Sequence, residues 1–134
     1  MVNPVKLHEI SISVRWGDMD AASVINNAVY FRYVEDVRVS WFQKIGYTLD
    51  MRETGPVLVN ASMDFLLAVS FPCNLIVRMF AEPPGRSSVK THYELCCSDT
   101  GRMMAKGSAV VVWVNFNEKK SVPIPKLILS HLAK

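Results

Sequence analysis

Two carboxylates and two side-chain amides stand close together in one short stretch of the chain. Asp18 and Asp20 are two residues apart, and Asn26 and Asn27 follow where a helix is expected to begin. A carboxylate can serve as a nucleophile or as a general base. The first turn of a helix presents unpaired backbone N–H groups and the positive end of the helix dipole, which suit a developing oxyanion. This stretch therefore combines the two parts of an acyl-transfer site.

The same residues also have a structural interpretation. Asp and Asn before a helix are most often caps and turn formers. Residue types and spacing alone do not decide between capping and catalysis, so both interpretations stay open.

A second segment, Gly85-Arg86-Ser87-Ser88, carries groups that suit phosphate. A turn leading into a strand offers backbone N–H groups, and this one adds two hydroxyls and a guanidinium. The alternative is an ordinary surface turn.

The sequence lacks the residues of a serine or cysteine hydrolase. No serine stands in a Gly-x-Ser-x-Gly setting, and no cysteine has an evident histidine partner. His92 falls on the polar side of a strand, where we expect it to be solvated.

The segment with the two aspartates is expected to join a strand to a helix. From Ile10 to Trp16, apolar and polar residues alternate, which is typical of a half-buried strand. From about Asn27 to Ile45, apolar residues recur at helical spacing and form one stripe. The stripe contains Tyr30, Tyr33, Val34, Val37, Trp41 and Ile45, and the polar side contains Arg32, Glu35, Asp36, Arg38 and Lys44.

Alternation returns after the helix and continues through four runs joined by short turns. The apolar residues expected on one face of the first run are Val57, Val59, Ala61, Met63, Phe65, Leu67 and Val69. Further strands are expected at residues 75–82, 89–97 and 103–116, and a short helix within 123–132. A single long helix must bury its stripe, and the apolar face of this meander is the available partner. The predicted fold class is α+β, a curved antiparallel sheet wrapped around one central helix in the order β-α-β-β-β-β.

Composition narrows the class of protein further. A chain of 134 residues fits one domain, residues 1–134, and a domain of this size often buries more surface by pairing with a copy of itself. The net charge of +3 is spread without a basic run, so no nucleic-acid partner is expected. No stretch approaches the ~20 apolar residues that span a bilayer, and no membrane partner is expected. Three cysteines without metal-type spacing and a first segment without a signal core predict a reducing, cytoplasmic location and no metal site.

The motif around the aspartates resembles the signature of the 4-hydroxybenzoyl-CoA thioesterase-like family. The matching residues are Val14-Arg15-Trp16-Gly17-Asp18-Met19-Asp20 and Ile25-Asn26-Asn27-Ala28-Val29-Tyr30-Phe31-Arg32-Tyr33. The family shows an aromatic residue, Asp-x-Asp, a short stretch of small residues, Asn-Asn and a Tyr on the following helix. The order of elements and the Gly85-Arg86-Ser87-Ser88 turn are similar as well, so the resemblance covers nearly the whole chain.

This resemblance implies a hotdog fold, a homodimer or homotetramer with sites at the subunit interface, and hydrolysis of an acyl-CoA thioester without metal or organic cofactor. It implies that Asp20 is the catalytic carboxylate, as nucleophile or as base. It further implies that N–H groups near Asn26 and Asn27 polarise the thioester carbonyl and that Tyr30 lines the acyl pocket. The phosphate groups of CoA are expected near Arg86, Ser87 and Ser88.

Two positions depart from the family pattern. Ser23 stands where the family usually has Gly, and Val24 stands where it often has His. The first change matters if the backbone there needs a positive φ. The departures motivate an alternative, a non-catalytic acyl-thioester-binding hotdog protein. A hydratase would need a histidine working with the carboxylate, and the Asp20 loop has none.

Overall fold

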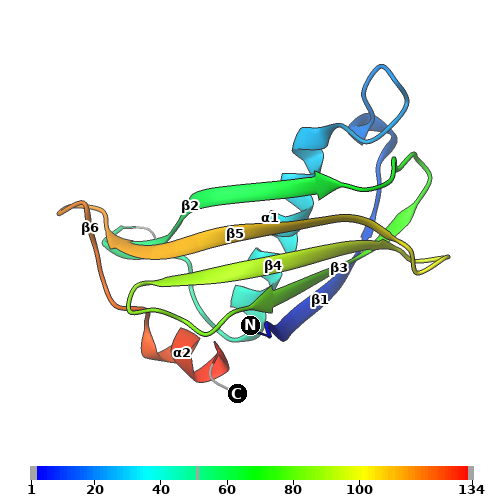
Figure 1. Cartoon of the computed structure of the whole chain (residues 1–134). Coiled ribbons are helices and arrows are strands. Elements are labelled where there is room, and N and C mark those ends of the chain that lie inside the picture. Colours follow the sequence, from blue (N-terminus) through cyan, green and yellow to red (C-terminus); the bar gives the residue numbers. More distant parts are fainter. Residues whose placement is uncertain (1–2, 51, 133–134) are drawn as a thin grey trace.

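A computed structural model describes residues 3–50 and 52–132 of the chain. Two helices, a short 3-10 turn and a six-stranded sheet make up the described fold (Figure 1). The elements in chain order are β1 (Val5–Ser13), η1 (Trp16–Asp18), α1 (Asn27–Lys44), β2 (Thr54–Phe65), β3 (Asn74–Ala81), β4 (Ser88–Cys97), β5 (Met103–Asn115), β6 (Lys120–Ser121) and α2 (Lys126–Leu132). Within the described ranges, neither helix combines the length and the hydropathy needed to cross a membrane.

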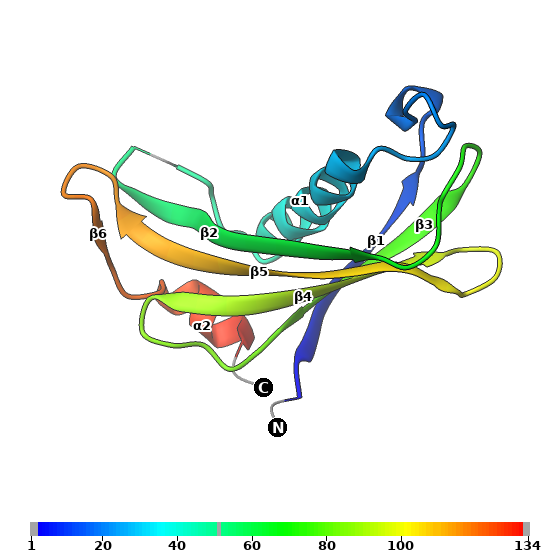
Figure 2. The same ribbon diagram turned by 45° about the horizontal axis from the view of Figure 1, so that its top comes forward.

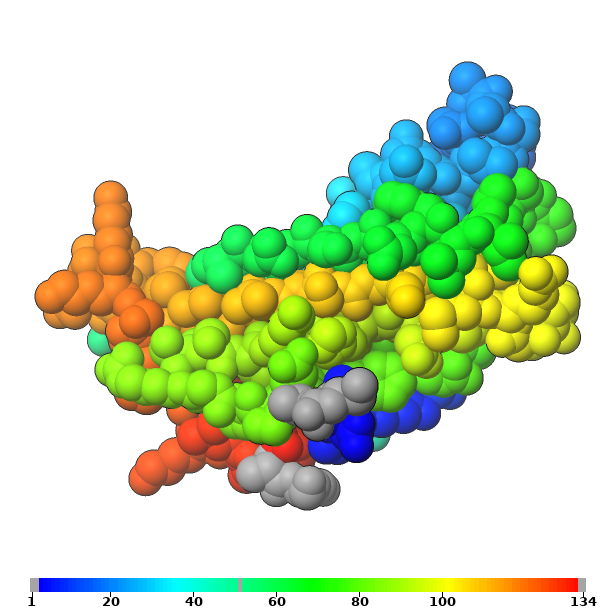
Figure 3. Space-filling model, viewed as in Figure 1, coloured from blue at the N-terminus to red at the C-terminus, as the bar shows by residue number. Residues whose placement is uncertain are grey.

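The sheet is antiparallel and has the strand order β1-β3-β4-β5-β2, with β6 added beside β5. It curves around α1, which lies on its concave side (Figure 2). The predicted α+β hotdog architecture is therefore confirmed. The outer face of the sheet has no helix over it (Figure 3).

Periodicity explains most of the core. On β3, the residues Leu75, Val77, Met79 and Ala81 are buried while their neighbours are exposed or half-buried, as their alternation predicts. Most of the predicted helical stripe is buried on α1, and Ile45, just after the helix, is half-buried against the core. Ile128 and Leu132 of α2 close the end of the core near the chain termini.

The predicted first strand was misplaced at its end. Alternation through Trp16 suggested a strand from Ile10 to Trp16, but β1 ends at Ser13 and Trp16 is 73% exposed. The chain turns away after Val14 because Asp18 and Arg15 close the η1 turn: the Asp18 N–H donates to the Arg15 carbonyl, and the Arg15 N–H donates to Asp18 Oδ2. Alternation of apolar and polar residues does not reveal this turn, because the turn depends on hydrogen bonds between Arg15 and Asp18.

The predicted face of β2 was also wrong in its first part. Leu58 lies opposite Val111 and Asn60 opposite Val110, so Val59 is an extra residue in a β-bulge. Leu58, rather than Val57 or Val59, therefore shares the inner side with Ala61. The strand ends at Phe65, and Val59 is 60% exposed.

Arg38 was predicted on the polar side of the helix and is instead buried. Only 8% of its surface is exposed, and its Nη1 donates to the hydroxyl of Tyr93 on β4 at 3.0 Å. A polar partner 55 residues away makes this burial possible, because buried charges require hydrogen bonds. Arg38 stands four residues after Val34 and four before Phe42, both buried, so its position lies on the buried face of α1 although its residue type suggested the polar side.

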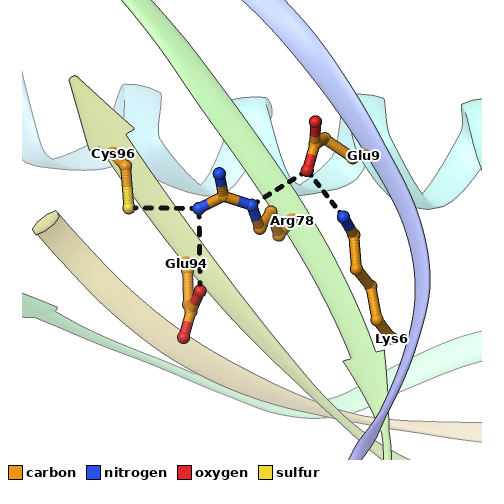
Figure 4. A network of polar contacts seen from close by, with 5 residues as sticks. All are labelled: Lys6, Glu9, Arg78, Glu94 and Cys96. Atoms are coloured by element: carbon orange, nitrogen blue, oxygen red, sulfur yellow. Dashed lines mark hydrogen bonds and ion pairs between the residues drawn. The ribbon is translucent and has the colours of Figure 1, made fainter. Parts of the chain in front are cut away.

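The outer face carries a row of alternating charges across the five long strands. Glu9, Arg78, Glu94, Lys106 and Asp64 are successive register partners on β1, β3, β4, β5 and β2. Figure 4 shows the best-connected part, where Arg78 Nε donates to Glu9 Oε1 at 2.9 Å and Lys6 Nζ donates to the same oxygen at 2.7 Å. These two hydrogen bonds, Lys6 first, lower the pKa of Glu9.

The polar strand position of His92 predicted a solvated side chain. His92 does lie on this outer face, but it is paired with a carboxylate. Its Nε2 is 2.5 Å from Glu82 Oε2, and both side chains are about two-thirds buried. Glu82 follows β3 directly and reaches back over the sheet, so the pairing depends on the turn at residues 82–87 rather than on β4 itself.

Candidate active site

The loop between β1 and α1 contains a small hairpin with Asp20 at its turn. Met19 and Ile25 form an antiparallel bridge, the Asp20 N–H donates to the Val24 carbonyl at 2.8 Å, and the Ser23 N–H donates to the Asp20 carbonyl at 3.0 Å. Ser23 has a φ of +60°, in the left-handed region. This is the residue of a tight turn and bulge where Gly is normally found. The turn therefore does need a positive φ, and in this chain a serine adopts it.

Replacing this serine by glycine is expected to stabilise the protein. A non-glycine residue in the left-handed region costs roughly 1 kcal/mol, which glycine avoids, although glycine adds freedom to the unfolded chain. We expect Ser23→Gly to raise the free energy of unfolding by about 0.5 kcal/mol, measured by chemical denaturation.

Ala22→Gly is the matched control, because its φ is not positive and glycine there only loosens the unfolded chain. Ala22→Gly is expected to destabilise. A Ser23→Gly variant that is destabilised as much as Ala22→Gly would contradict the idea that this turn is strained.

Asp18 has a structural position. Its Oδ2 accepts the Tyr33 hydroxyl at 2.7 Å and the Arg15 N–H at 3.0 Å, which ties the loop to α1. Burial, and then this bond to a carboxylate, raise the pKa of Tyr33 far above its ordinary value, so its hydroxyl keeps its proton. The side chain of Asp18 therefore holds the loop against α1.

The side chain of Asp20 accepts fewer hydrogen bonds than that of Asp18. Its Oδ1 accepts the Ala22 N–H at 2.8 Å, an Asx turn, and its Oδ2 accepts no hydrogen bond from any described residue. The side chain is exposed at the tip of the hairpin. The capping interpretation therefore accounts for one oxygen of Asp20 and leaves the other free to act on a ligand.

The start of α1 is open at one N–H group. Asn26 is the N-cap, with its Oδ1 accepting the Ala28 N–H at 2.9 Å, and its own N–H donates to the Asp18 carbonyl at 3.0 Å. Its backbone is therefore occupied, and only its side-chain NH2 remains as a donor. The Asn27 N–H has no acceptor among the described residues. Of the two predicted backbone donors, Asn27 is the one that this geometry leaves available.

Tyr30 is the fourth residue of α1, at the end of its first turn. Its side chain is 2% exposed, and its ring meets Phe65 edge-on with centroids 5.1 Å apart. Burial, followed by the nearby Cys73 thiol, raises the pKa of Tyr30. Its predicted role in an acyl pocket stays a prediction.

A cavity lies between α1 and β2, and its lining begins at Ala28, the residue after Asn27. Its volume is about 250 Å³. On one side it is lined by α1 from Ala28 to Arg38, and on the other by the inner side of β2, including Leu58 and Met63. The lining combines apolar side chains such as Leu58 and Met63 with the charged side chains of Arg32, Glu35 and Arg38, a mixture typical of ligand sites.

Arg86, Ser87 and Ser88 lie at the opposite end of the sheet from Asp20. The register places Ser13, where the Asp20 loop begins, beside Asn74, whereas the turn of Arg86 follows Ala81 at the far end of β3. The Arg86 and Ser87 carbonyls accept the N–H groups of Ile124 and Trp113, so the turn is anchored while the Arg86 side chain is exposed. One protomer therefore does not bring the two predicted sites together.

Two residues near the site were missed as functional candidates. The helical spacing assigns Tyr33 only to the apolar stripe, although its hydroxyl donates to Asp18 Oδ2. Arg38 was read as a surface residue and lines the cavity. A buried polar tip on a helical stripe is the signal that identifies both. Among the described residues, no group of three His, Cys, Asp or Glu side chains is arranged to hold a metal ion.

A curved antiparallel sheet wrapped around one long helix is the hotdog fold, which the structure shows. The sequence matches the thioesterase-like superfamily over residues 14–132, and the chain belongs to that superfamily. The predicted resemblance is thereby confirmed.

Known proteins resemble the chain over most of its length. The PA2801 protein of Pseudomonas aeruginosa has a TM-score of 0.90 and 34% identity, covering 96% of this chain and 99% of that one. Protein YsmA of Bacillus subtilis is 30% identical over 111 residues, 83% of this chain and 75% of that one. A thioesterase of Thermus thermophilus, solved with coenzyme A and zinc, has a TM-score of 0.80 and 26% identity, covering 95% of this chain and 92% of that one.

Proposed function

We propose that this protein hydrolyses acyl-CoA thioesters to a free acid and CoA, with Asp20 as the catalytic carboxylate. The observation that carries the proposal is the free Oδ2 of Asp20 on a hairpin tied to the open start of α1. The hydrogen bond from the Asn26 N–H to the Asp18 carbonyl makes that tie, and it leaves the Asn27 N–H unpaired. A carboxylate and an oxyanion donor thus belong to one hydrogen-bonded loop.

The chemistry follows from these two groups. Asp20 either takes a proton from water as the water oxygen attacks the carbonyl carbon, or attacks that carbon itself to form an anhydride that water then cleaves. The Asn27 N–H, aided by the helix dipole, donates to the carbonyl oxygen as it becomes negative. The carbon–sulfur bond breaks, the CoA thiolate leaves and takes up a proton, and the acid is released.

The proposed working unit is a homodimer paired through β2. This strand is an edge of the sheet, and exposed apolar residues gather on it and just after it. They are Leu58, Val59, Phe65, Leu66 and Leu67, from 37% to 60% exposed. An unpaired edge of this kind is a template for another strand, and self-pairing would cover it.

The dimer also gives the CoA segment a place. Antiparallel pairing of β2 with its copy reverses the sheet, so the Arg86 end of one protomer lies toward the Asp20 end of the other. Arg86, Ser87 and Ser88 can then hold phosphate groups of a CoA whose thioester reaches the partner's Asp20. The coenzyme A bound by the Thermus thermophilus thioesterase supports this ligand class.

The three free cysteines support a cytoplasmic location.

A charge on the β2 edge is expected to separate the protomers. Val59→Lys removes an apolar contact worth about 1.5–3 kcal/mol and does so twice across a two-fold interface. We expect the dimer to dissociate at micromolar concentration, measured by sedimentation velocity.

Leu127→Lys is the control, because Leu127 is 39% exposed on α2, away from this edge. If Leu127→Lys dissociates the protein and Val59→Lys leaves it dimeric, the β2 pairing is wrong.

The assay that tests the function is hydrolysis of a panel of acyl-CoA esters by the wild-type protein. Chromatographic separation of CoA from its ester avoids interference from the protein thiols. Turnover supports the proposal. Saturable binding without turnover would instead support the non-catalytic alternative, which the Asx turn at Asp20 favours.

A further inference from the structure

Arg38 is a buried cation whose charge is not neutralised by any described carboxylate. It is 8% exposed, and no carboxylate oxygen of the described chain lies within 4.0 Å of it. Its only side-chain hydrogen bond joins Nη1 to the Tyr93 hydroxyl, with the guanidinium 5.9 Å from the centre of the Tyr93 ring. A buried charge with one neutral hydrogen bond is costly unless something else binds it.

The remaining guanidinium nitrogens, Nε and Nη2, have no hydrogen-bond partner among the described residues. Every fully buried side-chain nitrogen or oxygen among the described residues has a hydrogen-bond partner. Nε and Nη2 of Arg38 have none, so they are not fully buried, and Arg38 lines the cavity between α1 and β2. Arg38 also lines a neighbouring cavity of about 270 Å³ between α1 and the first half of β2, so both open spaces beside its guanidinium lie between the helix and this strand.

The free edge of this guanidinium is the one that binds carboxylates. Nε–H and Nη2–H are parallel donors that match the two oxygens of a carboxylate. The chain itself shows this pairing at Arg52, whose Nε and Nη2 donate to Asp50 Oδ1 and Oδ2 at 2.9 and 2.8 Å. Arg38 presents the same edge without the carboxylate.

Arg38 is also held firmly in place. Tyr93 is 1% exposed, and its hydroxyl is 2.8 Å from Thr91 Oγ1, which in turn is 3.0 Å from the Ala109 carbonyl. These contacts can form one continuous series of hydrogen bonds. Arg38 donates to Tyr93, the Tyr93 hydroxyl donates to Thr91, and the Thr91 hydroxyl donates to the Ala109 carbonyl. The guanidinium is fixed against β4 before any ligand arrives.

The cavity sets the distance from the reacting carbon. It begins at Ala28, next to the Asn27 N–H, and ends at Arg38, eleven residues or about 16 Å along the helix axis from Asn27. The Arg38 side chain shortens this span, because helical side chains tilt toward the N-terminus. The other charged residues of the lining are Arg32 and Glu35, so the net charge of the lining is positive.

We propose that the acyl group carries a carboxylate at its far end and that Arg38 binds it through Nε and Nη2. The substrates are then mono-CoA thioesters of medium-length dicarboxylic acids, with the carbon chain packed between α1 and β2. This inference rests on the proposed hydrolysis at Asp20, and it names the substrate class of that same site.

The test compares octanoyl-CoA with its ω-carboxy analogue, the mono-CoA ester of octanedioic acid. Binding to Asp20→Asn is measured by calorimetry, which needs no turnover, and kcat/KM is measured with the wild-type protein. We expect the ω-carboxy ester to bind at least tenfold more tightly and to have the higher kcat/KM. In Arg38→Met this preference is expected to disappear or reverse. Equal binding of the two esters to Asp20→Asn overturns the inference but not the hydrolase function.

Matched variants keep the result interpretable. Arg38→Lys keeps the charge but loses the paired donors, so an intermediate preference is expected even if Arg38→Met folds poorly. Arg52→Met removes an arginine with a similar carboxylate contact at an exposed position and should leave the preference unchanged. Binding of neither ester to a folded Asp20→Asn protein would count against both the inference and the proposed function. A preference unchanged in Arg38→Lys would assign the discrimination to another residue and overturn the role of Arg38.

Discussion

Asp20→Asn is expected to lower kcat for acyl-CoA hydrolysis by a factor of about 10²–10⁴. The amide is nearly the same shape as the carboxylate, and its oxygen can still accept the Ala22 N–H that closes the turn. The hairpin should therefore persist while the negative charge and the basic oxygen are lost. Steady-state kinetics with the best ester of the panel gives kcat and KM, and KM is expected to change much less than kcat.

Asp18→Asn and Asp36→Asn separate the role of Asp20 from a general effect of charge. Asp18 accepts the Tyr33 hydroxyl, so its replacement is expected to lower the thermal midpoint more than it lowers kcat. Asp36 is exposed on α1 and should be neutral in both measurements. If Asp18→Asn lost more kcat than Asp20→Asn, the assignment of the two carboxylates would have to be reversed.

Gly107→Ala is expected to destabilise the fold by about 2–3 kcal/mol. Gly107 lies on β5 opposite Met63 of β2, and a Cβ there would be 2.6 Å from the Ser62 carbonyl oxygen and 2.9 Å from the Met63 sulfur. A backbone oxygen cannot rotate away as a side chain can, so the edge strand must move as a whole. Urea denaturation with an unchanged m-value measures the loss.

Gly17→Ala is the matched control for this substitution. A Cβ on Gly17 meets nothing within 4 Å, and its φ is not in the left-handed region, so the change in stability should stay within about 0.5 kcal/mol. Equal effects at both glycines would mean that β2 adapts to the extra methyl group. Because β2 also forms the proposed dimer edge, Gly107→Ala is expected to weaken self-association as well.

Much of the fold could be predicted because burial on one face leaves a periodic trace. Leu75, Val77 and Met79 on β3 and the Tyr30–Trp41 stripe on α1 show that trace clearly. The bulge at Val59 leaves no periodic trace in the sequence, because a bulge is defined by the pairing of its strand with the neighbouring strand. The turn after Val14 was hidden for a related reason, since Trp16 continues the alternation although it is 73% exposed.

The candidate site could be proposed from sequence, but the contacts of its residues could not. The motif placed Asp18, Asp20, Asn26 and Asn27 together, and the structure ties Asp18 to Asn26 at the start of α1 and leaves Asp20 at the tip of the hairpin between them. It was hydrogen bonding that distinguished the anchored Asp18 from the freer Asp20, and the occupied Asn26 N–H from the open Asn27 N–H. The bond from Arg38 to Tyr93 spans 55 residues, a relation that no local pattern contains.

The charged row on the outer face has a consequence for how the sheet assembles. A slip of one residue between strands is penalised by turning the core outward, but a slip of two keeps every side chain on its own face. In this sheet, a slip of two would set Arg78 against His92 or Cys96 and Glu94 against Ile76 or Phe80, so opposite charges would no longer meet. We therefore expect the pairing of Arg78 with Glu94 to favour the native alignment of β3 and β4 over a two-residue slip that hydrophobic burial alone would accept.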